Sequence, residues 1–349
     1  MAANSRGLSL VELMVAMAIS LILLLGVIQI YVSSTATSRA QEGLSRVQEN
    51  ARFALDAMQR DLRMAGHSGC PRTEPPEMTI MANHADSDYL LSGRYVEGVD
   101  DATDTDPDFW LNGEPDDLVE GQPAIRVTFT SGTEVGAEPG SFGNSAEFDL
   151  DSNTIGLRQN DFVVVTNCRT AHVAEITNDI NEGTGTVNLA HGAGGGQSGG
   201  GNSPHQWDGT EQDYDDGAQV MRQHSYTYYI AQNGRDIPAL YRRDDMRSDD
   251  QAEILELVEN VEAMRIAYGE DTDGDLQVDQ YRPASALSDN DWDSVISVRV
   301  ALLLRSDEVL SETFDTSYDL LGQDVLNFND SRRIRQMATA TVSLRNRLQ

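Results

Sequence analysis

A continuous apolar run near the start of the chain limits what the sequence can fold into more than any other feature. Residues 8–32, LSLVELMVAMAISLILLLGVIQIYV, contain one charged side chain, Glu12. As an α-helix with a rise of about 1.5 Å per residue, the run spans roughly 37 Å, enough to cross a bilayer with some tilt. A secretory signal peptide is cut after its apolar stretch. Here the polar leader MAANSRG precedes the stretch and ends in Gly7, so a cut at Gly7 leaves the helix on the mature chain.

The helical pattern continues beyond the apolar run. Residues 35–65 contain no Pro and a single Gly, and apolar residues recur there at spacings of three and four: Leu44, Val47, Ala51, Leu55, Met58 and Leu62. Such a stripe indicates an amphipathic helix that lies against a folded head. A coiled coil is the alternative, but it requires heptads over a longer stretch than this. We therefore predict one helix over residues 8–65, capped by Gly66.

From residue 70 onward the pattern becomes that of short strands. Runs of β-branched and aromatic residues between turn residues predict strands at 124–130, 162–166, 172–177, 226–231, 295–305 and 337–345. Residues 84–117 and the glycine-rich 192–204 lack periodicity and are expected to be long surface loops. The predicted fold class is α+β, with a long N-terminal helix (membrane half 8–32, amphipathic half 33–66) packed on an antiparallel β-rich head over residues 67–349.

The first residues resemble the prepilin motif. In that family a glycine precedes the cut, the new N-terminal residue is methylated, and the fifth mature residue is glutamate; here these are Gly7, Leu8 and Glu12. Leu8 departs from the family's usual Phe. Because a charge inside an apolar run costs about 2.5 to 3.5 kcal/mol on insertion scales, an incidental Glu is unusual there. The resemblance implies that Glu12 pairs with the free amine of Leu8 in a neighbouring subunit; an ordinary signal anchor with a stray Glu is the alternative.

Four separated stretches resemble PilW-type minor pilins of the type IV pilus: the N-terminal motif and residues 48–70, 261–281 and 332–348. The resemblance implies a pilin-like head in the periplasm of a Gram-negative bacterium, first anchored in the inner membrane and later part of the pilus. Expected partners are other minor pilins, the major pilin, a pilus tip adhesin, the inner-membrane assembly platform and prepilin peptidase. A pseudopilin of a type II secretion system and a membrane-anchored calcium-dependent adhesin are the alternatives.

The charge balance excludes several functions. The chain has 57 acidic residues against 25 basic ones, all of them Arg. Such a chain repels nucleic acid, so a direct nucleic-acid ligand is not expected. Such a composition suits a saline habitat, where the distance over which charges repel one another shortens to a few Å, or simply reflects an acidic high-GC organism. Because the chain has no Lys, it cannot carry P-loop or Schiff-base chemistry, and it contains neither an HExxH nor a GxSxG motif. We therefore predict that the protein is not an enzyme and binds no organic cofactor. His172 and His224 are expected to be structural residues.

The two cysteines and the arginines at the end of the chain each lead to a specific prediction. A head in an oxidising compartment predicts a disulfide between Cys70 and Cys168, the alternative being two buried thiols. Five arginines lie in the last 18 positions: Arg332, Arg333, Arg335, Arg345 and Arg347. They form either a solvated face or a docking surface for an acidic partner pilin.

An aspartate-rich loop is the candidate metal site. In EDTDGDLQVDQ, carboxylates fall at relative positions 1, 3, 5 and 9, which are Asp271, Asp273, Asp275 and Asp279. Alternate carboxylates in a tight loop suit Ca²⁺, with the main-chain carbonyl of Gln277 as a further ligand. The loop is not a full EF-hand, because position 12 is Arg where a bidentate Glu is required. It is expected to top a hairpin between strands at 261–268 and 295–305; an empty, solvated Asp-rich turn is the alternative.

Overall fold

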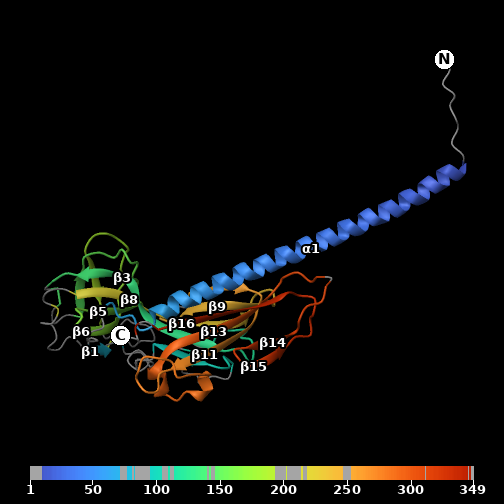
Figure 1. Cartoon of the computed structure of the whole chain (residues 1–349). Helices are drawn as coiled ribbons and strands as arrows, with labels where there is room; N and C mark the ends of the chain where they lie inside the picture. Colours follow the sequence, from blue (N-terminus) through green and yellow to red (C-terminus); the bar gives the residue numbers. More distant parts are fainter. Residues whose placement is uncertain are drawn as a thin grey trace.

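The computed structural model shows one long helix and a β-rich head (Figure 1). It describes residues 10–70, 77–80, 82, 95–103, 109–110, 114–139, 141–142, 146–192, 202, 214, 218–246, 253–310, 312–344 and 346. Helix α1 (Leu10–Met64) lies with its C-terminal part along the head, and its N-terminal part projects away from it (Figure 1). At ~1.5 Å per residue its 55 residues extend over about 80 Å.

Helix α1 divides into two halves because the sequence changes character along it. Residues buried against the head occur only in the second half, at helical spacing: Val47, Ala51, Ala54, Leu55, Met58, Asp61 and Leu62. Met58 and Leu62 are fully buried, and burial of such a side chain contributes about 1.5 to 3 kcal/mol. The helix ends before Gly66, whose φ of 70° suits glycine and whose N–H donates to the Thr128 carbonyl. This agrees with the predicted helix over 8–65 within the described residues.

Within the residues that the structure describes, the head consists of strands, with two short 3₁₀ helices between them. The elements are β1 (Glu77–Ile80), β2 (Val96–Val99), β3 (Ala124–Ala137), β4 (Glu147–Leu150), β5 (Phe162–Thr166), β6 (Thr170–Glu175), β7 (Val187–Ala190), β8 (Ala218–Gln232), β9 (Pro238–Asp244), β10 (Ile254–Glu259), β11 (Val261–Glu270), β12 (Gln280–Arg282), η4 (Ala284–Ala286), η5 (Asp291–Ser294), β13 (Val295–Arg305), β14 (Ser317–Leu320), β15 (Asp324–Asn327) and β16 (Arg335–Ser343). Each of the six predicted strands overlaps one of these.

The strands form a large sheet, a four-stranded sheet and a hairpin among the described residues. The large sheet runs β1-β6-β5-β8-β3-β4-β7, with β9 and β10 joined to it through β8 and with β2 paired to β3. Long strand β8 organises it, since its first part pairs with β5 and its last part with β9. The second sheet runs β12-β11-β13-β16, and β14 pairs with β15.

The main core lies between α1 and both sheets. Side chains from the helix pack with Ile125 and Val127 of β3 and with apolar residues of β11, β13 and β16, such as Val300, Leu302 and Val342. A separate core around Phe148 and Val220 fills the part of the head built from β4, β5, β7 and β8. Because its amphipathic half is part of the main core, α1 holds its apolar half in a fixed direction relative to the head.

One expectation about loops needs correction, and a second falls mostly outside the described residues. Residues 84–117 were expected to form one surface loop, but they contribute strand β2 and the buried pair Phe109 and Trp110. Trp110 Nε1 donates to the Ala102 carbonyl (3.4 Å), and its ring meets Tyr229 edge-on, so this segment covers one end of β8. Most of 192–204 lies outside the described residues; Asn202, which is described, is buried and bonds Glu175 through both of its side-chain amide atoms.

Candidate functional site

The N-terminal half of α1 is a long apolar surface that the described head leaves exposed. Among the described residues it is the one helix apolar and long enough to cross a membrane, and its most apolar window has a mean hydropathy of 2.7 and is 0% buried. Its large side chains from Leu10 to Val32 are at least half exposed. Glu12 lies in the first turn and is exposed. Gly7 and Leu8, the predicted cleavage pair, lie outside the described residues.

Asp61 fastens the other half of α1 to the head. Its carboxylate accepts hydrogen bonds from the Tyr228 hydroxyl and from Arg242 Nη1 (3.2 Å). The Arg242 guanidinium also lies 4.2 Å from the centre of the Tyr226 ring. Burial, and then the neighbouring carboxylate, raise the pKa of Tyr228 well above its usual value, so the phenol stays a donor. The sequence carried a signal that Asp61 faces the head, because Asp61 lies in the buried stripe between Met58 and Leu62, but it carried none for the partner of Asp61.

A disulfide links the segment just after α1 covalently to the large sheet. Cys70 and Cys168 are bonded, with their Cα atoms 5.4 Å apart and a sequence separation of 98. Cys168 lies in the turn between β5 and β6 with φ of 66°, and its N–H donates to Thr166 Oγ1 (3.0 Å). In the chain-entropy model a loop of this size stabilises the fold by about 4 to 5 kcal/mol. The predicted pairing is therefore present in the structure.

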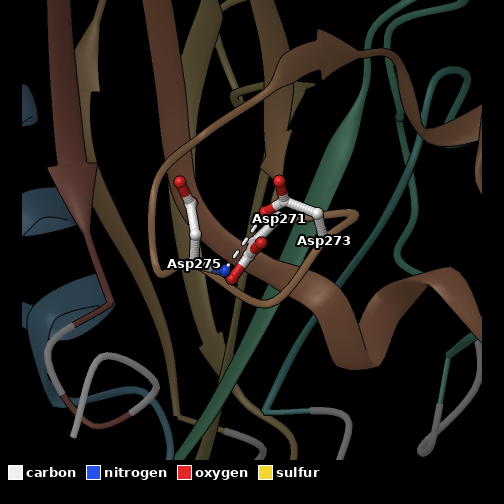
Figure 2. Close-up of side chains that lie close together, drawn as sticks. All are labelled: Asp271, Asp273 and Asp275. Atoms are coloured by element: carbon white, nitrogen blue, oxygen red, sulfur yellow. Dashed lines mark hydrogen bonds between the residues drawn. The ribbon is translucent and has the colours of Figure 1, made fainter.

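Three of the predicted aspartates meet in one loop. Oxygen atoms of Asp271, Asp273 and Asp275 all lie within 4.8 Å of one another, a spacing that suits ligands around Ca²⁺ (Figure 2). Asp271 is nearly buried at 9% exposure, whereas the other two are exposed. Gly274, with φ of 80°, lets the chain turn between them and donates its N–H to Asp271 Oδ1 (2.7 Å).

The other two predicted ligands are placed differently. Asp279 accepts hydrogen bonds from both the N–H (2.8 Å) and hydroxyl (2.6 Å) of Thr272, and these bonds lower its pKa. Gln277 donates its N–H to Asp275 Oδ1 (2.8 Å). The loop thus closes through its own hydrogen bonds, and it connects β11 to the short β12, not to β13 as expected. Strand β13 instead pairs along the opposite edge of β11.

The described C-terminal arginines differ in their burial and their partners. Arg335 is buried, and its guanidinium pairs with Glu262 and lies 4.5 Å from the Phe328 ring centre. Arg333 binds Asp330 (3.0 Å). Arg335 therefore has little side-chain surface to offer a partner, while the docking surface predicted for the C-terminal arginines stays a prediction. Arg345 and Arg347 lie outside the described residues, while Arg332 is exposed.

The buried histidines have structural partners. His172 Nδ1 lies 2.7 Å from the Tyr214 hydroxyl, and His224 Nδ1 lies 3.1 Å from Asp244 Oδ2. Burial, with a smaller contribution from the charge of nearby His172, lowers the pKa of His191 to about 4. These imidazoles belong to the interior of the head.

Comparison with known proteins gives matches at both ends of the chain. Residues 227–346 match the family model for type IV pilus-assembly protein W, and residues 2–28 match the prokaryotic N-terminal methylation motif. No curated protein matches the chain. Among solved structures, a type IV-like pilin from Thermus thermophilus is 15% identical, over 36% of this chain and 67% of that one, with a TM-score of 0.21. The two family-model matches show that the chain is similar to PilW-type minor pilins of the type IV pilus over residues 227–346 and to prepilins at its N-terminal motif.

Proposed function

We propose that this protein primes type IV pilus assembly as part of a complex of minor pilins and stays in or near the pilus tip. The observation that carries the proposal is the apolar half of α1, which no part of the described head covers. Such a surface requires lipid before assembly and apolar helices of other subunits afterwards. The proposal assigns no catalytic step to the head.

The partners follow from the order of events. Prepilin peptidase cuts after Gly7 and methylates Leu8; the inner-membrane platform then delivers the subunit to other minor pilins, the major pilin and a tip adhesin. In this complex Glu12 pairs with the amine of a neighbouring subunit, which offsets its cost in the apolar segment. Twitching, adhesion or DNA uptake would follow from the pilus that the complex starts.

The test replaces Glu12 in cells that make the pilus. Glu12→Ala is expected to insert into the membrane at least as well as the natural protein, because the change removes about 2.5 to 3.5 kcal/mol of insertion cost. Its incorporation into the minor-pilin complex, measured by cross-linking and co-purification, is expected to fall. Glu42→Ala removes the same charge from an exposed position beyond the apolar segment and should change neither quantity. Normal incorporation of Glu12→Ala would contradict the pairing.

A further inference from the structure

A groove lies where α1 departs from the head, and we call it the helix–head groove. Its volume is about 500 Å³, which falls in the range of pockets that hold small ligands. Tyr31, Val32 and Arg39 line it from the helix, and Val309, Leu310 and Arg332 from the head. The groove therefore has apolar walls and two guanidinium groups.

The head wall of the groove is held in place by backbone and side-chain contacts. The Leu310 N–H donates to the Arg332 carbonyl (2.8 Å), so the two lining segments are joined. Next to them, Arg333 donates to the Ser306 carbonyl (2.8 Å) and pairs with Asp330. Leu310 is 8% exposed, whereas Val309 is 49% exposed and offers its surface to an occupant. These contacts hold the residues of the head wall in fixed positions.

The two arginines are unusual in so acidic a chain. The protein has 57 acidic and 25 basic residues, yet among the described residues neither the Arg39 nor the Arg332 guanidinium makes an ion pair or hydrogen bond. Asp330, the acidic residue closest to Arg332 in sequence, is already paired with Arg333. Guanidinium groups favour phosphate and carboxylate, to which they donate two parallel hydrogen bonds. Charge complementarity therefore points to an anionic occupant with an apolar part.

The position of the groove along α1 identifies that occupant. Arg39 lies seven residues beyond Val32, the end of the apolar run, which is ~10 Å along a helix. The polar layer on each side of the hydrocarbon core is about 5 to 8 Å thick, and Tyr is enriched at that depth. When α1 spans the membrane with Tyr31 at the hydrocarbon boundary, the Arg39 backbone lies a few Å beyond the polar layer, and its long side chain can extend back toward the lipid phosphates. Arg332 lines the same groove as Arg39.

We propose that the helix–head groove binds one phospholipid of the periplasmic leaflet while the subunit is in the membrane. Arg39 and Arg332 hold the phosphate, one from the helix and one from the head, and an acyl chain lies along Tyr31, Val32 and Val309. The proposal rests on the membrane anchoring proposed above. The competing occupant is the apolar helix of a second copy of this chain, but that segment offers one carboxylate in 25 residues for two guanidinium groups.

The test measures lipid binding by the full chain in a neutral detergent. Native mass spectrometry during titration with phosphatidylglycerol gives the affinity for retained lipid. Arg39→Gln together with Arg332→Gln is expected to weaken binding at least about tenfold, since each basic residue near an anionic lipid surface contributes about 1 kcal/mol. Arg60→Gln with Arg169→Gln removes one exposed arginine from the helix and one from the head, outside the groove, and should leave the affinity unchanged. Val309→Ser should weaken binding through the acyl chain alone.

Three results would overturn the proposal. The first is equal lipid affinity for the groove and control variants. The second is displacement of the lipid by millimolar inorganic phosphate, which would show that the apolar wall is not used. The third is unchanged lipid binding with loss of co-purifying pilins in the groove variant, which would make the groove a protein interface. Failure of the natural chain to float with phosphatidylglycerol vesicles would instead contradict the membrane anchoring itself.

Discussion

Replacing Asp61 by Ala is expected to loosen α1 from the head without touching the apolar half of the helix. The change removes the acceptor of two buried hydrogen bonds, from Tyr228 and Arg242. Side-chain exposure is 10% for Asp61 and 25% for Arg242, so the pair is mostly shielded from water. The variant leaves a buried phenol and a half-buried guanidinium without their acceptor.

The expected loss follows from the two bonds. A hydrogen bond to a charged group contributes about 1.5 to 3 kcal/mol, so two contribute about 3 to 6 kcal/mol. Arg242 keeps its contact with the Tyr226 ring and some access to water, which places the estimate at the lower end, about 3 kcal/mol. Since the entropy of unfolding is about 2.1 cal/mol/K per residue, a head of about 280 residues should show a fall in Tm of roughly 5 °C. Asp61→Asn keeps an acceptor and should lose less.

Thermal unfolding of the full chain in detergent, followed by near-ultraviolet circular dichroism, measures this effect. Asp56→Ala is the matched control: it lies on the same helix, and its contact with Arg52 (3.7 Å) joins two exposed side chains. Exposed pairs contribute about 0 to 1 kcal/mol, so its Tm should change by at most about 2 °C. Equal shifts for Asp61→Ala and Asp56→Ala would refute the conclusion that Asp61 fastens the helix.

Two further predictions concern calcium and pH. At about 10 mM Ca²⁺, a calcium site of extracellular affinity would raise the Tm by roughly 5 °C relative to the protein in chelator. The double variant Asp273→Ala with Asp275→Ala should abolish this rise. Identical Tm values of the natural protein in calcium and in chelator would rule the site out. The pKa of His191 falls to about 4 on folding, so the unfolded chain binds more protons than the folded chain between pH 6.5 and 4. The free energy of unfolding should therefore decline as the pH falls through that window, by about 3 kcal/mol at its lower end. His191→Gln should flatten the decline, and an unchanged slope would exclude His191 as its cause.

The sequence predicted elements whose signal is local. The stripe from Val47 to Leu62 indicated the packed half of α1, and alternating or β-branched runs indicated strands such as β8 and β13. The disulfide followed from having two cysteines in an oxidising compartment. The spacing of Asp271, Asp273 and Asp275 indicated a loop that gathers carboxylates, which the structure contains.

Contacts that depend on the folded topology were not predictable. Asp61 and Tyr228 are separated by 167 residues, and no local pattern links a helix to a particular strand at that distance. Strand β12 has three residues and is defined by pairing with β11, so its sequence carries no alternation. The helix–head groove combines Arg39 and Arg332, which come together only because α1 lies along the head.

The measurement that tests the central claim most directly is the intact mass of the natural protein extracted from membranes of cells with an active prepilin peptidase. A PilW-type minor pilin should lack residues 1–7, begin at Leu8 and carry one methyl group on its N-terminal amine. This is the form in which the whole apolar half of α1 stays on the chain. An uncut chain, or a chain cut after the apolar run, would contradict the account.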